Sequence, residues 1–159
     1  MDQKKLARWL KVIIIGVGIC GLVVFLLIVP AYGQSIAYDY PEFAYCYWPW
    51  LIFLWVAALP CYAALVLAWK VAVNIGNDRS FSVENANLLR KVSYLAAGDS
   101  AFFFVGNVVL LFMSMSHPGI TLMSLIVVFF GIAVAVASAA LSHLITKAAV
   151  LQEDSDLTI

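Results

Sequence analysis

Residues 12–31 read VIIIGVGICGLVVFLLIVPA, a run of twenty residues without a charged side chain. A helix that crosses the roughly 30 Å hydrocarbon core of a membrane needs about 20 apolar residues, so this run is long enough to span a bilayer. Backbone amides find no water to bond inside lipid, which makes an α-helix the expected structure. The preceding residues 4–11 read KKLARWLK and place four cations at one end of the run.

Three further apolar runs of similar length follow, at about 48–69, 94–115 and 121–146. Hydrophobic residues make up 65% of the chain and charged residues 11%, against roughly 45–50% and about 25% in soluble domains. So few charges cannot cover a water-soluble surface, and most of the exterior must face lipid. We therefore predict a single all-α domain, residues 1–159: an integral membrane bundle of four transmembrane helices, the first at about 12–31.

All nine Lys and Arg residues lie on one side of this predicted membrane. Four precede the first span, four lie between the second and third (Lys70, Arg79, Arg90 and Lys91), and Lys147 follows the fourth. The connections 32–47 and 116–120 contain none. Because cytoplasmic loops carry the excess of Lys and Arg, the pattern predicts a protein of the bacterial inner membrane with both termini in the cytoplasm. The connection 70–93 and the tail 147–159 would then be cytoplasmic.

The N-terminal segment has a second interpretation as a cleavable signal peptide, since a basic start and an apolar run precede Ala31-Tyr32-Gly33. We favour an uncleaved span, because the run exceeds the ~7–15 residues usual for a signal peptide core. Cleavage would also leave three crossings and divide the basic segments between the two sides of the membrane.

The external connection is rich in aromatic side chains, which are Tyr32, Tyr38, Tyr40, Phe43, Tyr45, Tyr47, Trp48 and Trp50. Amphipathic rings prefer the headgroup level, so we expect an interfacial belt on which this segment lies flat. The alternative is an aromatic cap that binds a ligand, which would require a defined pocket. Cys46 is the only cysteine near this border, because Cys20 and Cys61 lie in spans. We expect a packed thiol there, with an intermolecular disulfide as the alternative.

The internal connection carries signals for the ends of two helices. Gly76-Asn77-Asp78-Arg79 reads as a turn, Ser82 is placed as an N-cap, and Glu84 suits the first helical turn. Nothing then interrupts a helix until His117-Pro118-Gly119, which predicts about 33 helical residues, or roughly 50 Å. The fourth helix continues past Lys147 in the same way. We therefore expect helices 3 and 4 to extend into the cytoplasm.

The projecting part of the third helix is amphipathic. One side carries Phe81, Leu88, Leu89 and Val92, and the other carries Glu84, Asn87, Arg90 and Lys91. The chain ends in an acidic tail with Glu153, Asp154 and Asp156. These features suit either packing and solvation or a partner surface. The candidate partner-binding residues are Phe81, Glu84, Arg90, Lys91, Glu153, Asp154 and Asp156.

Asp99 lies within the third predicted span, about 12 Å along the helix from Lys91. A charged carboxylate is unfavourable there by a few kcal/mol or more, so we expect Asp99 to be protonated or paired and turned away from lipid. His143 and Ser100 lie at a similar depth. The functional interpretation is a proton- or ion-handling pair of Asp99 with His143, and the structural one is hydrogen bonding between helices.

Small residues recur every four positions at Gly131, Ala135 and Ala139, and at Ala97 and Ala101. Such faces let helix backbones approach closely. We expect them to pack helices within the bundle, with a homo-oligomer contact as the alternative. Pro60 should bend the second helix.

Several short motifs resemble an uncharacterised bacterial family of four-span membrane proteins, domain of unknown function 2975. They are Tyr40-Pro41-Glu42-Phe43-Ala44, Leu59-Pro60, Ser80-Phe81-Ser82 with Leu88 to Lys91, Pro118-Gly119-Ile120, and the acidic ending from Leu151 to Ile159. The resemblance covers the whole chain and implies no catalytic or binding residues. Members of that family are often encoded beside a small Xre-type helix-turn-helix regulator.

The sequence contains no nucleophile–base pair, metal-ligand cluster or phosphate loop, and we predict no enzyme, no cofactor, no metal and no direct nucleic-acid binding. Besides the lipid bilayer, the expected partner is a small Xre-type DNA-binding regulator, held at the inner membrane face by the third helix and the acidic tail. The alternative function is a small ion- or proton-coupled transporter or channel that works through Asp99.

Overall fold

The computed structural model describes residues 2–156, with side chains up to residue 152. Its elements are α1 (Gln3–Val23), the π-helix η1 (Val24–Ile28), α2 (Val29–Asp39), the 3-10 helix η2 (Pro41–Cys46), α3 (Tyr47–Gly76), α4 (Val83–Phe112) and α5 (Pro118–Asp156). Four continuous helical stretches are long and apolar enough to cross a membrane: Gln3–Asp39, Pro41–Gly76, Val83–Phe112 and Pro118–Gln152. The prediction of an all-helical chain with four apolar helices is confirmed.

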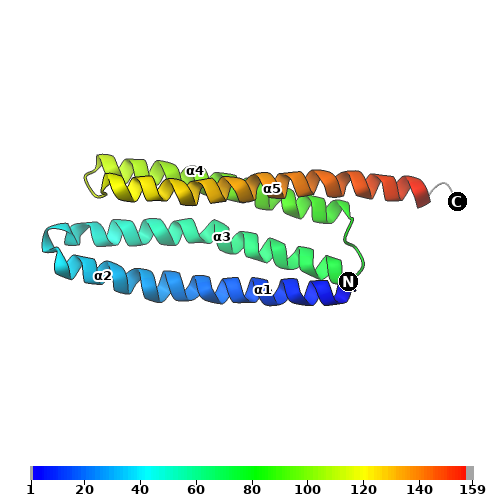
Figure 1. Ribbon diagram of the computed structural model, residues 1–159, viewed down its shortest axis with the longest axis horizontal. Helices are drawn as coiled ribbons and strands as arrows, with labels where there is room; N and C mark the ends of the chain where they lie inside the picture. Colours follow the sequence, from blue (N-terminus) through cyan, green and yellow to red (C-terminus); the bar gives the residue numbers. More distant parts are fainter. Residues whose placement is uncertain (1, 157–159) are drawn as a thin grey trace.

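The long helices run antiparallel, and both ends of the chain lie at the same end of the molecule (Figure 1). The bundle is open: α1 contacts α3, α3 contacts α4 and α4 contacts α5, while in the described part of the chain α1 and α5 do not meet. Two contacts bring the basic segments together. Ser80 Oγ donates a hydrogen bond to Gln3 Oε1 at 2.7 Å, and Ser142 Oγ donates one to the Ala86 carbonyl at 2.7 Å.

The expectation that a loop joins the first two spans over residues 32–47 is wrong, because this segment is helical. The first helix continues to Asp39, and Pro41–Cys46 form a 3-10 helix that leads into α3. Pro30 does not end the helix, because the backbone shifts to π-helical bonding just before it and the Val29 amide bonds to the Val24 carbonyl. The Phe25 carbonyl thereby loses its α-helical donor, and Pro30 has no N–H to replace it. Trp55 Nε1 donates to this carbonyl instead, at 2.8 Å.

The α3 helix packs on α1 and carries Pro60 in its interior. The helix changes direction near its middle, as the proline predicts (Figure 1). Just beyond the bend, Tyr62 Oη donates a hydrogen bond to the Gly18 carbonyl at 2.9 Å. A Cβ at Gly21 would lie 2.6 Å from the same phenol oxygen. Glycine is therefore required there for the close approach of the tyrosine to α1.

Both α3 and α4 end in the same left-handed turn. Asp78 and Ser114 have positive φ angles of 58° and 57°. The amide that follows each of them reaches back to a carbonyl of the last helical turn, Arg79 to Asn74 and Met115 to Leu110. This Schellman geometry satisfies carbonyls that would otherwise lack donors. It ends α4 at Phe112, four residues before the limit expected from His117-Pro118-Gly119. The Ser82 N-cap is confirmed, since its side chain accepts from the Asn85 amide.

The α4 and α5 helices pack along a seam of small and polar residues. On α4 the buried positions recur every seven residues, at Ala86, Ser93, Ser100 and Asn107. On α5 they are Ser124, Ala135, Ser138 and Ser142, together with Gly131, where an added Cβ would collide with Ser100 Oγ. The expected contact face on α4 is wrong, because Ala97 and Ala101 are exposed, as is Ala139 on α5. A seven-residue spacing keeps the seam aligned over many turns, whereas a four-residue spacing drifts around the helix.

Candidate functional site

A pocket of about 500 Å³ lies at the end of the molecule opposite the termini. We call it the aromatic pocket. Its walls come from α2, η2, the first turns of α3, the α4–α5 turn and the start of α5. The lining residues are Val29, Tyr32, Gly33, Ile36, Ala37, Phe43, Cys46, Tyr47, Trp50, Leu51, Leu54, Ser114, Met115, Ser116, His117 and Ile120.

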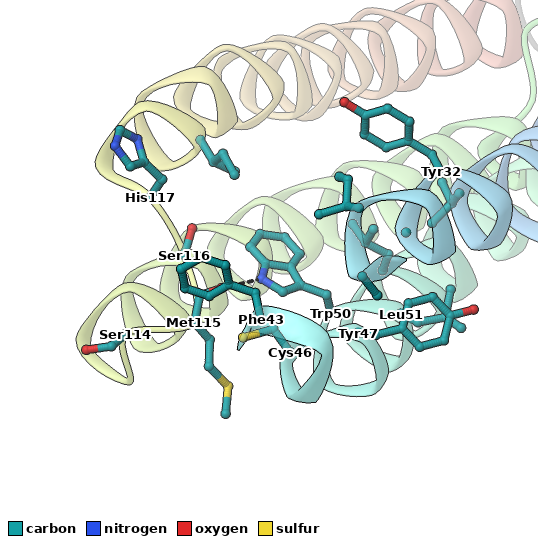
Figure 2. Close-up of a pocket in the computed structure, with 16 residues that line it drawn as sticks. Tyr32, Phe43, Cys46, Tyr47, Trp50, Leu51, Ser114, Met115, Ser116 and His117 are labelled. Carbon is teal, nitrogen blue, oxygen red and sulfur yellow. Dashed lines mark hydrogen bonds between the residues drawn. The ribbon is translucent and has the colours of Figure 1, made fainter. Parts of the chain in front are cut away.

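Trp50 holds two of these walls together. Its Nε1 donates a hydrogen bond to the Met115 carbonyl at 2.7 Å, which joins α3 to the α4–α5 turn. Figure 2 shows Tyr32 and His117 on opposite sides of the pocket, with Trp50 between them. On the α2 side, Gly33 lies against the Tyr47 ring, and a Cβ there would come within 2.9 Å of that ring. In the described residues the backbones of α2 and α5 do not approach each other closely. They therefore stand on either side of the pocket without closing it.

The lining offers few polar groups and no carboxylate, Lys or Arg. Trp50 Nε1 is already bonded, and His117 Nδ1 accepts from the Gly119 amide at 3.1 Å. Ser116 Oγ is a buried polar atom of the lining, and within the described residues it has no hydrogen-bond partner. The pocket can therefore accept an uncharged, mostly apolar molecule, and Ser116 Oγ can give it a hydrogen bond.

The structure bears on both interpretations of the aromatic segment. Rings outside the pocket face outward, with Tyr38 86% and Trp48 61% exposed, which suits a belt at the headgroup level. The ligand-binding alternative required a defined pocket. The structure contains one, although the sequence did not show which residues line it. The α4–α5 turn supplies one wall, and no periodicity in the sequence links that turn to α2. Cys46 is 8% exposed, as expected for a packed thiol.

Asp99 lies against α3. Its Oδ2 atom accepts a hydrogen bond from Cys61 Sγ at 3.5 Å, and its Oδ1 atom is buried without a partner. Ser100 Oγ donates to the Ala96 carbonyl of its own helix. His143 is exposed on α5, and within the described residues no hydrogen bond joins it to Asp99. The structure thus brings Asp99 to a cysteine and leaves His143 outside that contact.

The predicted partner surface is only partly as expected. Glu84, Arg90 and Lys91 are exposed on α4, opposite the buried Leu88 and Val92. Phe81, placed on the packed side by the sequence pattern, is 59% exposed, because it precedes the helix and does not follow its periodicity. The α5 backbone stays helical to Asp156. The side chains of Glu153, Asp154 and Asp156, and all of residues 157–159, lie outside the described part.

Sequence reasoning missed Asn85, which is 0% exposed near the start of α4. Its Oδ1 accepts from Asn74 Nδ2 at 2.9 Å, and its Nδ2 donates to the Arg79 and Ser80 carbonyls at 2.9 and 3.1 Å. The side chain thereby ties together the end of α3, the connection 77–82 and the start of α4. An Asn three residues after an N-cap serine was the available signal, but its partners become adjacent only when the helices pair.

These observations define a membrane protein whose four long apolar helices are candidate spans. Within residues 2–152 no three His, Cys, Asp or Glu side chains are grouped so that they could hold a metal ion.

The chain belongs to the family described as "Protein of unknown function (DUF2975)", whose model matches residues 31–159. The chain is 30% identical to the "Uncharacterized membrane protein YoaS" of Bacillus subtilis (strain 168) over 153 residues, which cover 95% of this chain and 96% of that protein. No solved structure matches it. The resemblance found in the short sequence motifs is confirmed.

Proposed function

We propose that the protein is a regulatory interaction protein of the bacterial inner membrane, which holds a small Xre-type helix-turn-helix regulator at the cytoplasmic face. In this proposal both termini and the connection 77–82 are cytoplasmic, because the cations gather at that end of the molecule. The proposal assigns no enzymatic chemistry to the chain.

The observation that carries the proposal is the length of α5. The bond from Ser142 to Ala86 fixes the relation of the two helices. Fourteen residues of α5, 143–156, follow this bond, but only three residues of α4, 83–85, precede it. The difference of eleven residues corresponds to roughly 16 Å of helix. The end of α5 extends past the other helices (Figure 1) and carries Leu151 with 69% of its surface exposed.

The projecting end combines exposed apolar side chains with the acidic residues Glu153, Asp154 and Asp156 of the sequence. A regulator that binds DNA presents a cationic surface, and an acidic helix end is complementary to it. Contacts of this kind raise the association rate and weaken with salt. The exposed Glu84, Arg90 and Lys91 on α4 lie at the same end of the molecule and would form the rest of the surface.

Co-purification of the regulator encoded beside the gene tests the proposal. We expect the full-length membrane protein to retain the regulator in a salt-sensitive manner. Deletion of residues 153–159 should weaken the binding, and so should the triple change Glu153→Lys, Asp154→Lys and Asp156→Lys. A control variant removes two acids at the opposite end, Asp39→Asn with Glu42→Gln, and should leave binding unchanged. Absence of binding by the full-length protein would refute the proposal.

Asp99 favours a second candidate, a small ion- or proton-coupled transporter or channel. The supporting observation is its buried Oδ1 atom, which has no hydrogen-bond partner in the part of the chain that the structure describes. Intramembrane carboxylates often mark the path of an ion or proton. In proteoliposomes with an imposed ion or pH gradient, Asp99→Asn should abolish flux while the protein still folds. Flux that is unchanged by this substitution would remove Asp99 from any transport role.

A further inference from the structure

The aromatic pocket has no assigned role, and it lies at the end of the molecule away from the proposed partner surface. We propose that it binds one acyl chain of a bilayer glycerolipid, with Ser116 Oγ donating a hydrogen bond to an ester carbonyl of that lipid. This inference stands independently of the regulator contact.

The chemistry of the pocket walls determines which kind of ligand fits. Of the sixteen lining residues, none is Lys, Arg, Asp or Glu, and most are aliphatic or aromatic. A charged ligand would find no counter-ion there, and burying its charge without one is unfavourable. A volume of about 500 Å³ falls within the range of small-molecule pockets, roughly 300–1,000 Å³. The site therefore fits an uncharged hydrocarbon chain.

The surrounding bilayer can supply this hydrocarbon chain. The helices that wall the pocket are candidate membrane spans, and α2 and α5 flank it without close backbone contact in the described residues. A chain from the surrounding lipid can therefore enter sideways between them. Lipid is the one hydrocarbon ligand already in contact with a membrane protein on every side, so no separate delivery is needed.

The depth of the pocket along the helices matches the level of the lipid ester groups. The pocket lies where η2 leads into α3 and where α4 turns into α5, at the end of the helices that carries the exposed aromatic rings. Such rings lie at the headgroup level, where the ester groups that begin each acyl chain are found. Ser116 Oγ lies at this level and is buried without a partner. An ester carbonyl is an acceptor that satisfies this hydroxyl, and the acyl chain then continues along Trp50 and Leu54.

The test is photo-crosslinking in vesicles of phosphatidylethanolamine and phosphatidylglycerol. The probe is a phosphatidylglycerol with a diazirine in the middle of one acyl chain, and adducts are mapped by mass spectrometry. Leu51 reports entry, because it lines the pocket but is only 4% exposed, whereas Leu59 on the same helix is 67% exposed and reports ordinary surface lipid. We expect adducts at Leu51 as well as at Leu59. Labelling of Leu59 alone would overturn the proposal.

Two substitutions of equal size separate filling the pocket from perturbing the helix. Ala37→Trp places an indole in the pocket, whereas Ala31→Trp places one on the exposed side of α2. Ala37→Trp should lower the ratio of Leu51 to Leu59 adducts about tenfold, and Ala31→Trp should leave the ratio unchanged. An equal ratio in the two variants contradicts the inference.

Two further comparisons test the hydrogen bond from Ser116 and the source of the bound hydrocarbon chain. Ser116→Ala should reduce Leu51 labelling by the ester-containing probe about threefold to tenfold, the range expected for one neutral hydrogen bond. It should not change labelling by a diazirine-bearing alkane, which has no carbonyl. A probe made from a free long-chain alcohol tests the other source. If that alcohol labels Leu51 and the phospholipid does not, the occupant is a free amphiphile and the assignment to a bilayer lipid is wrong.

Discussion

At the scale of single residues, the α4–α5 contact depends on side chains that are small enough to let the backbones approach. Gly131 faces Ser100 Oγ so closely that any Cβ would collide with it, whereas Gly98 on α4 has open space around it. We expect Gly131→Val to destabilise the protein by about 1–3 kcal/mol, the usual effect of overpacking a filled interface. Gly98→Val should have a much smaller effect. Thermal unfolding of the two purified variants in the same detergent compares them, and equal losses would contradict this view of the seam.

Asn85 provides a second prediction at this scale. Asn85→Ala leaves the Asn74 amide and two carbonyls of the connection 77–82 without their partner. Buried polar groups left in this state destabilise a protein by about 1–3 kcal/mol. Asn87→Ala, at an exposed position on the same helix, is the matched control. In Asn85→Ala the connection should become more sensitive to protease and the unfolding temperature should fall. In Asn87→Ala neither quantity should change.

At the scale of the element, the first helical stretch continues past its proline with the help of a hydrogen bond from a tryptophan of another helix. Trp55→Phe removes the donor to the Phe25 carbonyl and should destabilise the protein by about 1–3 kcal/mol. Pro30→Ala restores a backbone N–H at the point where the π-helical register lacks one. We therefore expect Trp55→Phe to be less harmful in the Pro30→Ala background. A double-mutant cycle from denaturation measurements gives the coupling, and a coupling of zero would show that the two groups act independently.

At the scale of the whole molecule, the antiparallel helices bring the N-terminus, the connection 77–82 and the end of α5 to one end, together with all nine cations. The free energy of moving Lys and Arg across the membrane favours keeping that end in the cytoplasm. We expect an alkaline phosphatase reporter, which is active only outside the cytoplasm, to be active when inserted at Asp39 and inactive when fused to either terminus. Activity at a terminus would reverse the orientation and, with it, the proposed regulator contact.

The open arrangement of the helices is a further property of the whole molecule. Because, among residues 2–156, α5 contacts only α4 and α1 packs on α3, these residues leave one flank of the molecule without protein cover. In water such a surface would be unstable, but lipid is as apolar as the exposed side chains and no closed core is required. The same openness leaves the aromatic pocket accessible between α2 and α5.

Much of the fold could be predicted from the sequence because the strongest forces on this chain are local. The number of helices, the turn at Gly76–Arg79, the Ser82 cap and the bend at Pro60 follow from apolar length, capping chemistry and proline. The end of α4 was misplaced, since nothing in Met113-Ser114-Met115 requires a left-handed residue. Asp99 was identified by its position within an apolar run of the sequence. Its contact with Cys61 could not be predicted, because that contact depends on how α3 is rotated against α4.

The sequence alone determined that this is a membrane protein with four long apolar helices, which are candidate spans. Hydrophobic transfer and backbone hydrogen bonding act along the chain, and they can be evaluated residue by residue. Only the tertiary structure decided which small residues form the α4–α5 seam, which donor serves Phe25, and that α2, α3 and the α4–α5 turn enclose a pocket. Those features join residues as far apart in the sequence as Val29 and Ile120, and short-range packing and hydrogen bonds create them only after the helices have met.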